Sequence, residues 1–320
     1  SWTNGKNLWT VGAQADFQST KNGFQRFATS YYTFASFADF KNGVKPQDFA
    51  ITYSLLPDFA QAYPRFKFAQ YSIYGQDEIA ITNKFRLTVG LRLDLPTYPG
   101  VEEIKTHPLV SALTFANGEK INTGILPKVR ILWSPRIGFN WDVKGDRTLQ
   151  LRGGTGIFTG RIPTVWIVAQ SGDAGLIQFT QSFSGQANTP GIFNPNPNAY
   201  RPAVPPAAGT AIPSTISATD PNFKFPQTWK SSLAVDVKLP WGIVGSLEGI
   251  INKDLNVALG RNPNLVDPTP LNVAGYPDSR PIYPASNTLK FINPLTSAGQ
   301  VSPTGTNAFN PVVLNNAKKG

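Results

Sequence analysis

The chain has 320 residues, a formal net charge of +10, a hydrophobic content of 41%, and neither cysteine nor methionine. The missing cysteines exclude disulfides, thiol catalysis and thiolate metal sites, and no run reaches the roughly 20 apolar residues that a membrane-spanning helix needs. Lysine and arginine are spread without a basic helix or stripe, so the charge does not indicate nucleic acid; an anionic membrane surface or an anionic cargo stays open.

Eight segments alternate apolar and polar residues with the period of two that predicts a β-strand with one apolar face. In chain order the predicted strands are 7–17, 24–34, 65–81, 86–95, 128–143, 148–159, 227–238 and 242–251. Of 28 prolines only Pro135 falls inside a predicted strand, where it predicts a bulge or the membrane boundary of that strand.

The connections between these strands also alternate, between short and long. Short turns are predicted around 18–23, 82–85, 144–147 and 239–241, and long loops at about 35–64, 96–127, 160–226 and 252–316. Outer-membrane barrels have short periplasmic turns and longer extracellular loops. We therefore expect an all-β fold, an antiparallel transmembrane β-barrel; a soluble β-sandwich, with strands of about 5–6 residues, is the weaker alternative.

The hairpin at 134–160 shows the alternation best. Each arm approaches the roughly 9–11 residues that a strand needs to cross a bilayer. Across the whole chain, one face of the predicted strands is apolar and is predicted to contact lipid. Its residues are Leu87, Val89, Leu91, Leu93, Ile137, Phe139, Trp141, Leu149, Leu151, Leu233, Val235 and Val237.

The opposite face is polar and charged and is predicted to line a lumen. Its candidate residues are Arg86, Arg92, Asp94, Arg130, Arg136, Asp142, Arg152, Lys230, Asp236 and Glu248. These side chains would attract anionic cargo or hold a plug. Alternatively, they form a ladder of cross-strand ion pairs inside the barrel, which is the interpretation we favour for any single residue.

Other residue patterns that carry chemistry in proteins are weak here. The glycines of 152–156 (RGGTG) resemble a phosphate loop, but the residues after them cannot start the helix that such a loop needs. The only histidine, His107, is expected to be a solvated loop residue. Asp77 and Glu78 are neighbours on a strand and point to opposite faces, and the pair at 102–103 is expected to be solvated. We therefore expect no catalytic residue, metal or cofactor, and no enzyme.

Several segments resemble a known family. Residues 74–78 (YGQDE) and 87–94 (LTVGLRLD) resemble a hairpin of TonB-dependent outer-membrane transporters. Residues 134–139 (SPRIGF) and 151–158 (LRGGTGIF) are similar to a hairpin of the Oar-like branch, and 225–229 (FPQTW) looks like the strand start after a long loop in that branch.

The resemblance implies a 22-stranded barrel with a plugged lumen, energised through an inner-membrane complex. Eight strands are only part of such a wall, and the chain ends on the polar run NNAKKG. We therefore expect 1–320 to be a single partial barrel domain without the plug and the C-terminal strands. The implied partners are outer-membrane lipid and lipopolysaccharide, the TonB complex through the missing plug, and a surface lipoprotein over the loops, with no nucleic acid.

Three functions remain open at this point. The first is TonB-dependent import of a large or scarce solute across the outer membrane, with the long loops recognising cargo. The second is an outer-membrane barrel that acts as an adhesin or assembly scaffold. The third is a soluble carbohydrate-binding β domain.

Overall fold

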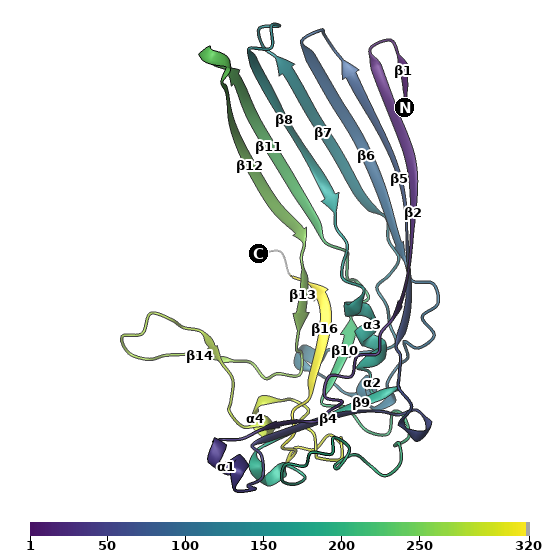
Figure 1. Ribbon diagram of the computed structural model, residues 1–320, viewed down its shortest axis with the longest axis vertical. Helices are drawn as coiled ribbons and strands as arrows, with labels where there is room; N and C mark the ends of the chain where they lie inside the picture. Colours follow the sequence, from purple (N-terminus) through teal and green to yellow (C-terminus); the bar gives the residue numbers. More distant parts are fainter. Residues whose placement is uncertain (318–320) are drawn as a thin grey trace.

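The computed structural model describes residues 1–317, so the last three residues of the polar chain end lie outside the described part. Two parts follow one another along the long axis of the molecule (Figure 1). One is a tall, curved sheet of long strands, called the wall below. The other is a group of shorter elements at one end of the wall, called the loop layer.

The wall contains eight strands in the order β1-β2-β5-β6-β7-β8-β11-β12, each antiparallel to its neighbours. Their bounds are β1 Trp2–Asn4, β2 Asn7–Lys21, β5 Arg65–Ala80, β6 Phe85–Thr97, β7 Leu132–Asp142, β8 Leu149–Thr159, β11 Gln227–Lys238 and β12 Val244–Asn256. The predicted strand at 227–238 coincides with β11, and most of the others differ from the observed strands by a few residues at their ends.

Tight turns join the wall strands in pairs at the end far from the loop layer (Figure 1). Gly145 and Gly242 have positive φ angles of 87° and 76°, which a glycine adopts at no steric cost. In the β7–β8 turn the Asp142 carboxylate accepts hydrogen bonds from the backbone N–H groups of Gly145 (2.8 Å) and Arg147 (3.1 Å). The short turns predicted at 82–85, 144–147 and 239–241 are confirmed.

The predicted wall strand at 24–34 is wrong, and so is the short turn at 18–23. Strand β2 continues to Lys21, which pairs with Arg65 of β5. The chain then enters tight turns, and Ser30 has a φ of 62°, which no strand accommodates. Only β3 (Tyr31–Thr33) is extended in this segment, and it belongs to the loop layer.

The wall is an open sheet. Within residues 1–317, β1 pairs only with β2 and β12 pairs only with β11, so the two edges do not meet. Closing a barrel requires its first and last strands to exchange ladder hydrogen bonds. The all-β, antiparallel fold is confirmed, and within residues 1–317 it is an open sheet with two edges rather than a closed barrel.

Pro135 produces no bulge in β7. The ladder to β6 runs without a register shift through the pair Leu91 and Pro135. The ladder to β8 starts one residue later, at the pair Arg136 and Gly156. The missing N–H of Pro135 thus falls where one ladder ends, at the loop-layer end of the wall. Strand β6 contains a second proline, Pro96, near the same end.

The loop layer contains three small sheets and short helices. The sheets are β3-β4-β9 with β4 Asp48–Ser54 and β9 Gln178–Ser184; β10-β16-β13 with β10 Thr215–Thr219, β16 Asn310–Asn316 and β13 Ala258–Arg261; and β14-β15 with Thr269–Pro270 and Pro281–Ile282. The α-helices are α1 Phe37–Lys41, α2 Pro108–Ala112, α3 Val165–Gly172 and α4 Asn287–Lys290. The 3-10 helices are η1 Pro57–Phe59, η2 Ala116–Gly118, η3 Gln186–Asn188 and, in the wall, η4 Pro240–Gly242.

The long connections are packed rather than structureless. Phe66 and Phe68, at the base of β5, are buried with Val168 of α3 and join the wall to the layer. A second core contains Phe115 and Phe309, whose ring centroids lie 6.1 Å apart. These core residues could not be predicted from the sequence, because they lie far apart in it, follow no local period and are surrounded by polar residues.

His107 is buried, with 0% of its surface exposed, so its expected place in solvent is wrong. Its Nδ1 accepts a hydrogen bond from the backbone N–H of Val110 (3.3 Å) at the start of α2. Its Nε2 then carries the proton and donates to the carbonyl oxygen of Ala211 (3.0 Å). Burial lowers the pKa of this imidazole.

Candidate functional site

The strand register places the predicted lipid-facing and lumen-facing residues on opposite sides of the wall. Across β6 and β7, Leu87 pairs with Phe139 and Val89 with Ile137, whereas Thr88 pairs with Gly138 on the other face. Every residue predicted to contact lipid lies on the first of these faces, called the apolar face below. The second is called the polar face. Contact of the apolar face with lipid stays a prediction.

Aromatic side chains form a row at each end of the apolar face. Near the tight turns lie Trp2 and Trp9, stacked with centroids 6.3 Å apart, together with Trp141. Near the loop layer lie Phe17 and Tyr71, in edge contact at 5.8 Å, with Trp133 and Trp229.

These two rows resemble the aromatic girdles that flank the apolar band of outer-membrane barrels. Trp133 and Trp141 lie eight residues apart on β7, which is about 26 Å along the strand at about 3.3 Å per residue. With a strand tilt of about 40° the rows are separated by about 20 Å in height, close to the usual band of about 25 Å.

Ion pairs cross the strands of the polar face. Arg152 of β8 is paired with Asp236 of β11 (2.9 Å) and lies 3.8 Å from Glu248 of β12. Arg86 of β6 pairs with Glu78 of β5 (2.8 Å). The cross-strand ladder therefore exists for these residues; their contact with a lumen stays a prediction.

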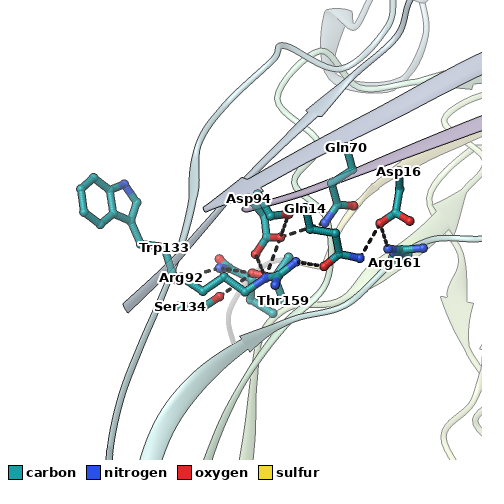
Figure 2. A network of polar contacts seen from close by, with 11 residues as sticks. Gln14, Asp16, Gln70, Arg92, Asp94, Trp133, Ser134, Thr159 and Arg161 are labelled. Carbon is teal, nitrogen blue, oxygen red and sulfur yellow. Dashed lines mark hydrogen bonds and ion pairs between the residues drawn. The ribbon is translucent and has the colours of Figure 1, made fainter. Parts of the chain in front are cut away.

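A buried hydrogen-bond network lies on the polar face, at its end near the loop layer (Figure 2). Asp94 of β6 is only 2% exposed. Its Oδ1 accepts hydrogen bonds from Gln70 Nε2 (3.0 Å), Ser72 Oγ (2.7 Å) and Arg92 Nε (3.0 Å). Because a buried carboxylate is costly unless it is paired and hydrogen-bonded, these donors explain how the wall holds Asp94.

The network continues across one more strand to the loop layer. Arg92 Nη2 donates to Gln14 Oε1 of β2 (3.1 Å), and Gln14 Nε2 donates to Asp16 Oδ2 (2.9 Å). Asp16 also forms an ion pair with Arg161, which follows β8. Figure 2 shows these side chains in one row, while Trp133 points away from them. A chain of polar contacts thus links β6, β5 and β2 with the start of the segment after β8.

Two glycines, Gly90 and Gly156, make room for the side chain of Arg136 on the polar face. A Cβ atom at Gly90 would lie 2.9 Å from Arg136 Nε, and one at Gly156 would lie 3.0 Å from Arg136 Cβ. Neither glycine therefore leaves room for a side chain. The glycines of 152–156 serve close approach within the wall, in agreement with their rejection as a phosphate loop.

Arg130, Asp142 and Lys230, also predicted to line the lumen, take no part in the ion pairs across the strands. Arg130 precedes β7, so the predicted strand start at 128 is wrong, and its guanidinium donates to Asn222 Oδ1 (2.9 Å) in the loop layer. Asp142 ends β7 opposite Gln150, its carboxylate closes the β7–β8 turn, and it forms no ion pair within residues 1–317. Lys230 lies on the polar face and forms no ion pair with any residue in 1–317.

Five members of the network were not predicted from the sequence: Gln14, Asp16, Gln70, Ser72 and Arg161. Four of them lie on the polar face of predicted strands or their extensions, which is the signal that could have found them. Arg161 carries no such signal, because it follows the end of β8 and reaches Asp16 only through the fold. The carboxylates at 102–103 do not form a pair: Glu103 accepts a hydrogen bond from the backbone N–H of Arg65 (2.7 Å).

No helix among residues 1–317 is long and apolar enough to cross a membrane. The described part of the chain also holds no group of three or more His, Asp or Glu side chains arranged for a metal ion. The polar face offers matched charges, amides and hydroxyls, which suit hydrogen bonding to a solute or a polypeptide.

A comparison with family models identifies the family of this chain. The family model of an outer membrane beta barrel domain covers residues 1–317. None of the curated proteins matches the chain.

Proposed function

This chain belongs to the family of outer membrane beta barrel domains, and from that premise we propose that it forms part of the wall of a TonB-dependent importer. The protein is located in the outer membrane, which a soluble carbohydrate-binding domain would not be. In the proposal the wall belongs to a 22-stranded barrel of the Oar-like branch, with a plug in its lumen. The cargo is a large or scarce solute, and the chain catalyses no reaction.

The polar network of Asp94 is the observation that carries this proposal. It covers the polar face at the end where cargo would pass between the loop layer and the lumen. Two cationic side chains on this face stay accessible: Arg92 is 29% exposed, and the exposed Lys230 forms no ion pair within residues 1–317. A polypeptide plug in the lumen would supply hydrogen-bond acceptors for both.

The proposed partners follow from the two faces. Outer-membrane lipid and lipopolysaccharide would contact the apolar face between its aromatic rows, and the TonB complex would act through the plug. A surface lipoprotein would cover the loop layer.

A second function, as an adhesin or assembly scaffold, is favoured by one feature of the loop layer. The segment with β14 and β15 projects from the rest of the layer as a long arm (Figure 1). Its side chains Val273 and Tyr276 are each 52% exposed. An arm with exposed apolar residues suits a protein partner.

Cysteine labelling in the whole protein separates the two functions. The chain has no cysteine of its own, so each substitution introduces one labelling site into it. In the Lys230→Cys variant, a membrane-impermeant maleimide added to cells in rich medium should react faster when the cells are energised than after a protonophore. The matched control, Leu247→Cys on the apolar face, should stay unlabelled in both states. Equal labelling of Lys230→Cys with and without energy would contradict import and favour the scaffold.

A further inference from the structure

A cavity of about 330 Å³ lies in the loop layer, away from the polar face of the wall. Its walls come from β4, β9, the loop at 202–211 and the turn at 298–300. Two of the wall residues, Gly175 and Gly209, have positive φ angles of 74° and 77°, so tight turns shape the wall. The volume is at the lower end of the roughly 300–1,000 Å³ of small-molecule sites.

Tyr53 of β4 places an unpartnered hydroxyl at this cavity. The residue is only 5% exposed and lines the cavity, and its hydroxyl makes no hydrogen bond to any residue in 1–317. Burial raises the pKa of Tyr53 to about 12, so the phenol keeps its proton at neutral pH. Its ring is stacked on Phe179 of β9, with centroids 5.8 Å apart, which fixes the ring in place.

Two amide side chains add further polar atoms to the cavity. Gln300 donates from Nε2 to the carbonyl oxygen of Thr210 (2.9 Å), and Gln181 donates to that of Ser297. Since these bonds use only the NH₂ groups, the Oε1 atom of each glutamine is left to accept a hydrogen bond from a ligand.

The residues that line the cavity in the described part of the chain are all uncharged. The nearby Arg201 is directed elsewhere, with its guanidinium 3.8 Å from the ring centroid of Phe59. A charged ligand would therefore lose its hydration without gaining a partner. The site suits a neutral molecule that has both an apolar surface and several hydroxyl groups.

One common way for an extended peptide to bind is to add a strand to a free sheet edge. The edge of β9 that does not pair with β4 is already occupied. Ser214 donates from its backbone N–H to the carbonyl oxygen of Thr180 (2.9 Å), and its Oγ accepts from the N–H of Ser182 (2.8 Å). This edge therefore offers no ladder to a peptide beside the cavity.

We propose that this cavity binds a neutral saccharide, one or two rings of a glycan. A sugar ring has a C–H face that packs on the apolar lining of Leu55, Pro202 and Pro206, and hydroxyl groups that bond to the Tyr53 hydroxyl and the two glutamine oxygens. As a statement about cargo, the inference rests on the proposed import, since it names the class of solute that the loop layer would recognise.

Calorimetry on the whole purified protein in detergent tests the proposal with maltose, cellobiose, xylobiose and chitobiose, and with the blocked peptide acetyl-Ala-Pro-Ala-amide. At least one disaccharide should bind. Tyr53→Phe removes only the unpartnered hydroxyl, so the fold should persist while the Kd rises about tenfold. The matched control Tyr63→Phe, an exposed tyrosine outside the cavity, should leave the Kd unchanged.

Binding of none of the disaccharides, binding of the peptide alone, or an unchanged Kd in Tyr53→Phe would each overturn the proposal. The outcome is independent of energy coupling, because binding to purified protein needs no TonB complex. Saccharide binding without energy-dependent labelling of Lys230→Cys would retain the saccharide site and reject import; labelling without saccharide binding would do the reverse.

Discussion

At the scale of single residues, Asp94 shows how the wall accommodates a buried charge. Its carboxylate replaces lost water with donors from three side chains on two neighbouring strands. The donors come from positions of one face, which the antiparallel register of β5 and β6 brings together. The network is therefore a consequence of pairing, and removing the charge at its centre should affect stability more than removing an exposed one.

We expect Asp94→Asn to destabilise the whole protein by about 1.5–3 kcal/mol, the usual contribution of a hydrogen bond to a charged group. The uncharged Oδ1 would accept its three bonds more weakly, and the NH₂ group in place of Oδ2 would face the Arg92 guanidinium instead of accepting its bond (3.2 Å). Urea unfolding in detergent measures the loss. The exposed Glu102→Gln control should change stability by less than about 0.5 kcal/mol; equal stability of the two variants would contradict a structural role for the network.

His107 should make the stability of the loop layer depend on pH. Its folded pKa lies below the ordinary value of 6.5, so between these two values the unfolded state binds more protons. The contribution is complete above pH 6.5 and is lost as the pH falls toward the folded pKa, because a proton on Nδ1 breaks the bond from Val110. Thermal unfolding at pH 7.5 and 5.0 should show this loss, and a smaller one in His107→Gln. An equal pH response in both proteins would refute the assignment.

At the scale of elements, β11 shows the two faces most simply. Leu233 is 53% exposed on the apolar face and sits near the middle of the strand, while its neighbour Ser232 lies on the polar face. We expect Leu233→Arg to reduce stability in lipid vesicles by about 2–4 kcal/mol, as for an arginine at the middle of a bilayer. Ser232→Arg should cost clearly less in the same urea titration. A reversed order would mean that the polar face contacts lipid.

How far the elements could be predicted depended on whether their pattern was local. Alternation alone located β6 and β11, because a strand with one apolar face repeats every two residues. The same test failed at 24–34, where an alternating stretch is interrupted by the left-handed Ser30. It also predicted Arg92 and Asp94 on one face, but their partners Gln14 and Gln70 could not be assigned, because the register between strands is not written in either strand alone.

At the scale of the whole molecule, the tight turns and the loop layer lie at opposite ends of the wall (Figure 1). Trp241 in the β11–β12 turn is 93% exposed and Val204 in the loop layer is 72% exposed. If the layer faces outward, Val204→Cys should react with an impermeant maleimide on intact cells. Trp241→Cys should react only after the outer membrane is permeabilised. The opposite pattern would invert the proposed orientation.

The sequence by itself determined the long wall strands, the division of their side chains into an apolar and a polar face, and three of the tight turns. These are local properties, set by a period of two and by residues such as Gly145 that allow a reversal of the chain. The tertiary structure decided that the long connections pack into a layer with its own cores, and that His107 and Asp94 are buried. It also created the cavity at Tyr53. The physical reason is the same in each case: register and packing join residues far apart in the chain, such as Phe115 and Phe309, and no local pattern specifies which of them meet.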